Sequence, residues 1–147
     1  MHNHVFVGFG FGPIQSGLFL YEAFLTGRFQ RLVVAEVVPE MVHALRQNRG
    51  QYALNVATPT SLKRCQIQGI EMLNPNVPAD RERLVEAVRD ATEIATALPS
   101  VTFYDNGTPE SVAGILADGL RRKAPDRKAR AVIYAVENHN HAAEILE

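Results

Sequence analysis

Short apolar runs alternate with amphipathic segments along the first third of the chain. The runs His4 to Gly8 and Arg31 to Glu36 are apolar and rich in β-branched residues, which is typical of buried strands. After each run, apolar residues recur at helical spacing, from Pro13 to about Thr26 and from Pro39 to Gly50. The pattern therefore predicts two successive strand–helix units.

The middle of the chain has a less regular pattern. Tyr52 to Ala57 and Cys65 to Leu73 are interpreted as two short strands around a turn that contains Pro59, which together form an extra hairpin. Asp80 is expected to cap a helix whose apolar residues share one face. Residues Glu93 to Leu98 fit either a continuation of that helix or a buried strand.

The last third begins with a turn signal at Asn106-Gly107. Thr108-Pro109 then has the form of a helix cap followed by a first-turn proline. A charged loop is expected from Lys123 to Lys128, and Ala129 to Val136 is the clearest strand of the second half. The remaining tail could begin one more helix.

This order of elements predicts the fold class. Strands alternate with helices and several strands are apolar on both faces, which indicates a mainly parallel sheet covered on both sides. We therefore expect an α/β, Rossmann-like, doubly wound domain with the extra hairpin in its middle. In such sheets ligands bind beyond the carboxyl ends of the strands, where the strand order reverses.

Composition narrows the class of protein. The chain has 147 residues, enough for one domain, with 46% hydrophobic residues and a formal net charge of −1. This charge balance argues against nucleic acid as a partner. The single cysteine, Cys65, forms no internal disulfide, so we expect a cytoplasmic protein. No stretch has the roughly 20 apolar residues that cross a membrane.

A glycine cluster follows the first predicted strand and opens the first predicted helix. In the sequence G8-F9-G10-F11-G12, Gly8 permits a tight turn and Gly10 has no Cβ to obstruct a pyrophosphate. The backbone N–H groups at the helix start would hold the phosphates. Pro13 stands where a dinucleotide fingerprint has its third glycine. Phe9 or Phe11 could form a wall of the same site.

Glu36 ends the second predicted strand, about where an acidic residue accepts hydrogen bonds from an adenosine ribose. A carboxylate there repels a 2′-phosphate, so NAD is favoured over NADP. The alternative for Glu36 is a solvated residue at a strand end. S-adenosylmethionine-dependent methyltransferases use a similar glycine turn, but they typically place an acidic residue where this chain has Phe6.

Asn138 follows the last predicted strand and has two interpretations of equal weight. Its amide could donate to a substrate oxygen that gains negative charge during hydride transfer, or it could cap the next helix. His139 and His141 suggest a metal site, but residues at i and i+2 do not share a helix face. We therefore expect no metal.

Five segments, in this order and spacing, resemble one known family. They are F6-V7-G8-F9-G10, V33-V34-A35-E36, the region 52–73, D90-A91-T92-E93-I94-A95-T96-A97-L98-P99, and A131-V132-I133-Y134-A135-V136-E137-N138. Together they resemble the amino-terminal domain of the mannitol dehydrogenase family, polyol-specific long-chain dehydrogenases that include mannitol-1-phosphate 5-dehydrogenase. By this resemblance, residues 93–98 form a strand.

The resemblance implies hydride transfer between NAD and a polyol or polyol phosphate. It implies that Gly8 and Gly10 approach the pyrophosphate, that Glu36 binds the ribose, that residues 96–98 lie on the nicotinamide side, and that Asn138 is catalytic. The family has a basic or polar residue near Ile14, so this chain departs from it there. The combined candidate cofactor site consists of Gly8, Phe9, Gly10, Phe11, Gly12, Ile14, Glu36, Thr96, Ala97 and Leu98.

The family's catalytic lysine belongs to a second, mostly helical domain. Lys63, Lys123 and Lys128 occupy no equivalent place in this sequence. We therefore expect residues 1–147 to be an NAD-binding domain without that substrate domain, either part of an enzyme or a stand-alone NAD-sensing module. The apolar surface left by such a domain could drive homodimer formation.

Overall fold

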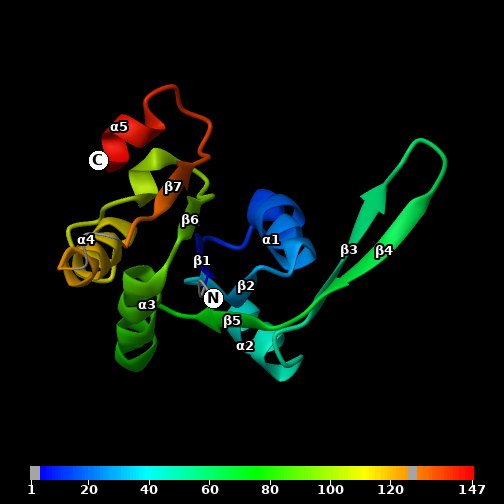
Figure 1. Cartoon of the computed structure of the whole chain (residues 1–147), viewed down its shortest axis with the longest axis horizontal. Coiled ribbons are helices and arrows are strands. Elements are labelled where there is room, and N and C mark those ends of the chain that lie inside the picture. Colours follow the sequence, from blue (N-terminus) through cyan, green and yellow to red (C-terminus); the bar gives the residue numbers. More distant parts are fainter. Residues whose placement is uncertain (1–3, 126–128) are drawn as a thin grey trace.

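A computed structural model describes residues 4–125 and 129–147 as an α/β structure built on a five-stranded parallel sheet (Figure 1). The strand order is β5-β2-β1-β6-β7. The strands are β1 (His4–Phe9), β2 (Phe29–Ala35), β5 (Ile70–Leu73), β6 (Glu93–Thr96) and β7 (Val132–Ala135). The expected Rossmann-like, mainly parallel sheet is confirmed.

Helices cover both faces of the sheet. On one face lie the π-helical segment η1 (Gln15–Phe19), α1 (Leu20–Thr26) and α2 (Pro39–Gln47). On the other lie α3 (Pro78–Asp90) and α4 (Val112–Lys123). Alternate residues of β1 supply the two cores, because Val7 packs with α3 and α4 while Phe6 packs with α1 and α2. The sheet is therefore doubly wound.

The order of the strands reverses between β1 and β6. The chain adds β2 and then β5 on one side of β1, and α3 carries it back across the sheet to β6 on the other side. The carboxyl ends of β1 and β6 therefore form the switch point, the place where ligands bind in open α/β sheets. Residues 93–96 form strand β6, which agrees with the strand interpretation of this segment.

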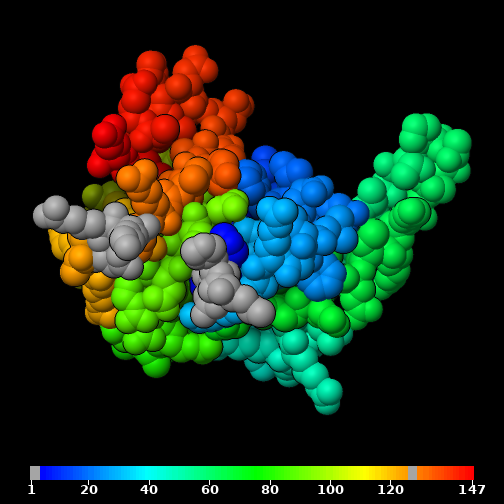
Figure 2. Space-filling model, viewed as in Figure 1, coloured from blue at the N-terminus to red at the C-terminus, as the bar shows by residue number. Residues whose placement is uncertain are grey.

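The extra hairpin is present, but its second strand is not the expected one. β3 (Tyr52–Ala57) pairs antiparallel with β4 (Leu62–Ile67), and the separate strand β5 pairs in parallel with β2. The single strand expected from Cys65 to Leu73 is thus two strands. Gly69, at φ +78°, lies between them and provides the turn. The hairpin projects away from the packed body (Figures 1 and 2).

Two helix starts differ from the sequence prediction. Val77 is the cap position of α3 and makes no side-chain capping bond, while Asp80 lies in the first turn and accepts the N–H of Asn74 at 2.9 Å. Asp80 also pairs with Arg46 at 2.6 Å, so it joins α3 to α2 rather than capping α3. The cap of α4 is Ser111, whose Oγ accepts the N–H of Gly114, and not Thr108.

The last described elements are the edge strand β7 and the short helix α5 (Ala142–Leu146), so the expected tail helix is present. The charged loop expected up to Lys128 lies partly outside the described residues, which omit 126–128. Among the residues that are described, no helix is long and apolar enough to cross a membrane.

Candidate functional site

A cavity of about 1010 Å³ opens at the carboxyl ends of the strands, over the switch point. Its lining comes from the glycine turn after β1, the end of β2 and the segments that follow β5, β6 and β7. Most of the sequence-predicted site residues line it, namely Phe9, Gly10, Phe11, Gly12, Ile14, Glu36, Ala97, Leu98 and Asn138. Gly8 and Thr96 do not belong to the lining.

The glycine turn passes closely between two strand ends. Gly10 has φ +86°, and its N–H donates to the carbonyl of Ala35 at 2.9 Å. A Cβ on Gly10 would lie 2.7 Å from the carbonyl oxygen of Ala97, so both conformation and space require glycine there. A Cβ on Gly12 would meet nothing within 4 Å. The open backbone of the turn is therefore at Gly12.

Gly8 makes room for a different neighbour, the side chain of Gln15. It lies inside β1, and a Cβ there would sit 2.6 Å from Nε2 of Gln15. Gln15 is fully buried and donates to the carbonyl oxygen of Ala95 at 3.0 Å, which ties η1 to β6. Gln15 was not among the residues predicted from the sequence. The available signal was a glycine inside a strand, which often marks the close approach of another group.

Glu36 lies at the end of β2 with its side chain fixed. The N–H of Phe11 and the N–H of Val38 each donate to one carboxylate oxygen, both at 3.0 Å. The residue is only 9% exposed, yet it lines the cavity. Each carboxylate oxygen has a second lone pair. Glu36 can therefore still accept hydrogen bonds from the hydroxyls of a ligand.

An apolar wall extends from Glu36 along the rim of the cavity. Val37, Val38 and Met41 line it and remain 56%, 42% and 37% exposed. Apolar side chains that stay exposed inside a concave site offer area for a flat, weakly polar group. The β2 side of the cavity thus joins a hydrogen-bond acceptor to an apolar surface.

A second buried carboxylate, that of Glu137, lies at the other side of the cavity. It accepts the hydroxyl of Thr96 at 2.9 Å, the N–H of Leu98 at 3.0 Å and the hydroxyl of Tyr104. Thr96 therefore points to Glu137 and not into the cavity.

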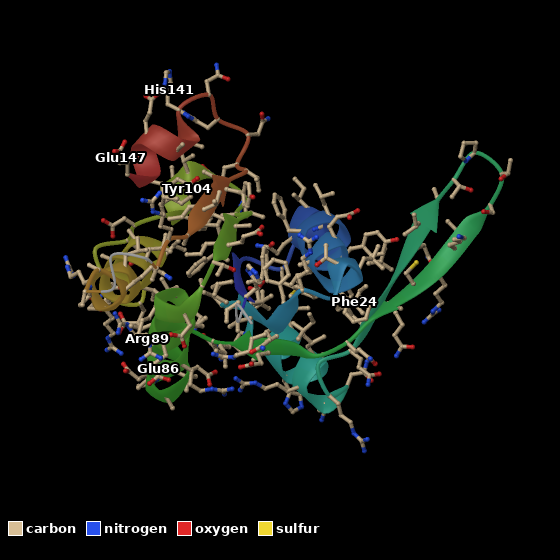
Figure 3. All side chains as sticks on the ribbon, viewed as in Figure 1. Phe24, Glu86, Arg89, Tyr104, His141 and Glu147 are labelled. Atoms are coloured by element: carbon tan, nitrogen blue, oxygen red, sulfur yellow. The ribbon has the colours of Figure 1, made fainter. Side chains whose placement is uncertain are left out.

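Tyr104 follows the short helix η2 (Val101–Phe103) and lies close to β7 (Figure 3). Burial, together with the hydrogen bond to Glu137, raises the pKa of Tyr104 to about 12. Its hydroxyl therefore remains a proton donor at neutral pH. The sequence patterns predicted no role for Tyr104.

Asn138 is exposed and lines the cavity on the same side as Glu137. The helix α5 begins at Ala142 with His141 in the cap position, so Asn138 does not cap it. No lysine lines the cavity within the described chain. Within the same residues, no three His, Cys, Asp or Glu side chains come together as metal ligands.

No family model and no curated protein sequence matches this chain. Among solved structures, mannitol 2-dehydrogenase of Pseudomonas fluorescens, in a ternary complex with NAD and D-mannitol, superposes with a TM-score of 0.75 at 14% sequence identity. That match covers 98% of this chain and 35% of the dehydrogenase, so this chain spans about a third of that protein.

A second structure, of a dipicolinate synthase subunit from Bacillus halodurans, gives a TM-score of 0.43 at 12% identity. It covers 99% of this chain and 45% of the other. Of the two matches, the first is close enough in structure to establish a shared Rossmann-type fold.

Proposed function

We propose that this chain binds NAD(H) and is the cofactor domain of an oxidoreductase. One observation carries the proposal. Glu36 accepts a hydrogen bond from the glycine turn, and both line the cavity over the switch point. In Rossmann-type sheets, dinucleotides bind across this crevice. An acidic residue at the end of the second strand then accepts hydrogen bonds from the adenosine ribose. The NAD complex of the structurally similar mannitol 2-dehydrogenase supports the same assignment.

The lining residues fit the parts of a dinucleotide. Glu36 would accept the adenosine ribose hydroxyls, and the apolar wall of Val37, Val38 and Met41 would face the adenine. Gly12 leaves open backbone for the pyrophosphate, although Pro13 has no N–H to offer. The other half of the cofactor would extend toward the segments after β6 and β7.

For the reaction, we propose hydride exchange with a polyol or polyol phosphate. When bound, NAD would be the hydride acceptor. Asn138 is the catalytic candidate, because its amide N–H on the cavity can donate to a substrate oxygen as negative charge develops there. By the family resemblance the general base is a lysine, and we propose that it comes from outside the described residues, since none of their lysines lines the cavity.

Calorimetric titration of the purified chain tests the cofactor assignment. We expect NADH to bind and NADPH to bind more weakly, because the Glu36 carboxylate would repel the 2′-phosphate. If neither NADH nor NADPH gives a heat of binding, the proposal is contradicted. Binding of S-adenosylmethionine in place of NADH would indicate the methyltransferase alternative.

A stand-alone NAD-sensing module is the second candidate function. It is favoured by the absence of a lysine from the described cavity lining. Because the general base is proposed to lie outside the described residues, turnover separates the two candidates only in a protein that includes that base. With NAD and either mannitol or mannitol 1-phosphate, such an enzyme forms NADH, which absorbs at 340 nm, whereas a sensing module binds NADH without turnover.

We also propose that the chain forms a homodimer through the β7 edge, which we define as Val132, Ile133 and Tyr134. These side chains are 52%, 36% and 39% exposed at the last strand of the sheet. The unpaired backbone groups of an edge strand are a template for pairing with another chain, and exposed apolar side chains beside them favour association.

A further inference from the structure

The cavity has a buried carboxylate near each of its two sides. Glu36 directly follows β2, and Glu137 comes shortly after β7. In the sheet, β1 and β6 lie between these two strands. The proposed NAD site uses Glu36 for the ribose and leaves Glu137 without a role. Glu137 is 7% exposed and accepts three hydrogen bonds from groups of the protein.

We propose that Glu137 is a positioning residue for the nicotinamide half of the cofactor, because it fixes the Ala97–Leu98 segment against which that half would rest. The inference depends on the proposed NAD site. With the ribose at Glu36, the crevice directs the rest of a dinucleotide across β1 toward β6 and β7. Ala97 and Leu98 form the cavity lining directly after β6.

Two hydrogen bonds hold this lining segment. The N–H of Ala97 donates to the carbonyl oxygen of Phe9 at 3.0 Å and so continues the pairing of β6 with β1. The N–H of Leu98, one residue farther, donates to Glu137. Removing the carboxylate therefore frees the segment at Leu98 and leaves its attachment at Ala97. Such a change alters the local shape of the cavity more than the overall fold.

The three donors explain why a carboxylate is needed. Its two oxygens together accept from Thr96, Leu98 and Tyr104 without donating. A glutamine at position 137 has one carbonyl oxygen, and its NH₂ group would face at least one of these donors. A buried donor left without an acceptor is costly, so the segment should shift to restore hydrogen bonding.

The test compares two ligands that differ by the nicotinamide. NADH carries it and ADP-ribose does not, while both contain the adenosine and pyrophosphate. For Glu137→Gln in the full chain, we expect the affinity for NADH to fall by about tenfold or more, as for a lost hydrogen bond to a charged group. We expect the affinity for ADP-ribose to stay within about twofold.

Glu93→Gln is the matched control, because Glu93 is a half-buried carboxylate at the opposite end of β6. It should change neither affinity. Tyr104→Phe provides a milder variant, since it removes one donor and keeps the carboxylate on Leu98 and Thr96. We expect it to lower the affinity for NADH by less than Glu137→Gln does. Circular dichroism identifies any variant that fails to fold.

The outcomes separate this inference from the proposed function. If the unaltered chain binds neither ligand, the NAD assignment fails, and the positioning role fails with it. If the unaltered chain binds both ligands equally well, or if Glu137→Gln weakens both by the same factor, the positioning role is overturned while the NAD site stands. Unchanged NADH affinity in folded Glu137→Gln and Tyr104→Phe also overturns it.

Discussion

The carboxylate of Glu36 accepts the backbone N–H of Phe11 at 3.0 Å, which joins the end of β2 to the glycine turn after β1. Its other oxygen accepts the N–H of Val38 at 3.0 Å. One side chain thus fixes two backbone segments that line the cavity. Glu36 therefore has a structural role in this turn besides its proposed role toward the ribose.

Glu36→Gln should reduce the preference for NADH over NADPH. The substitution removes the charge that would repel the 2′-phosphate and keeps one acceptor oxygen. We expect NADH affinity to fall by about tenfold, and stability by about 1 kcal/mol, because the new NH₂ group faces a backbone donor. Calorimetry with both nucleotides measures the ratio of affinities.

The control is Glu40→Gln, which removes a carboxylate from the exposed first turn of α2. It should leave both affinities unchanged. An unchanged ratio in Glu36→Gln would show that Glu36 does not contact the ribose region.

Gly8→Ala and Gly12→Ala should have opposite consequences. A methyl group at Gly8 would lie 2.6 Å from Nε2 of Gln15, so we expect a loss of about 1–3 kcal/mol of stability from overpacking. A methyl group at Gly12 meets nothing within 4 Å, and stability should change little. It would instead occupy the cavity wall, so Gly12→Ala should weaken NADH binding.

Urea denaturation and NADH titration of both variants check this pair. Gln15→Ala in the Gly8→Ala background should lose less stability than the two single substitutions combined, because the clash is then absent. Additive losses would show that Gly8 and Gln15 do not interact.

Local patterns in the sequence suffice for much of the framework. The strands β1 and β2, the glycine turn between β1 and η1, and the end position of Glu36 depend on residues that are neighbours in sequence. Apolar runs, glycine spacing and the first-turn Pro39 of α2 report such features directly. The strand β6 needed the family resemblance, because so short an apolar-rich segment fits a helix as well as a strand.

The remaining features depend on contacts between distant segments. Gln15 meets a carbonyl 80 residues away, and Tyr104 meets a carboxylate 33 residues away. Asp80 was expected to cap α3 but pairs instead with Arg46 of α2. The local sequence around Asp80 is the same whether its side chain caps α3 or pairs with Arg46. Only the packing of α2 beside α3 decides which partner it finds.

The ion pair between Arg31 and Glu71 should make stability depend on acidic pH. Their contact of 2.9 Å lowers the pKa of Glu71 below its ordinary value of 4.5, and Arg83 contributes to the same effect. The folded state therefore binds the proton less tightly than the unfolded state. The pair's stabilisation is complete above the ordinary value and is lost as the pH falls through the lowered pKa.

Glu71→Gln should remove this dependence. Because both partners are about one-third exposed, we expect a loss of no more than about 1 kcal/mol at pH 7. The difference between the two proteins should shrink as the pH falls below 4.5. Urea denaturation at a series of pH values measures it, and a constant difference at all pH values would contradict the argument.

The β7 edge should cause self-association that a single charge prevents. β7 pairs only with β6 among the described strands, so its outer edge offers unpaired backbone donors and acceptors beside exposed apolar side chains. A second copy can cover both at once. Val132→Lys puts a charge at the most exposed residue of this edge, and burying an unpaired charge opposes association. Sedimentation velocity over a range of concentrations should show a dimer that dissociates on dilution, and Val132→Lys should remain monomeric.

Leu62→Lys is the control, because Leu62 is 68% exposed on the projecting hairpin and away from β7. If Leu62→Lys abolishes the dimer and Val132→Lys does not, the hairpin is the interface; if the unaltered chain is a monomer at all concentrations, the β7 edge does not drive association.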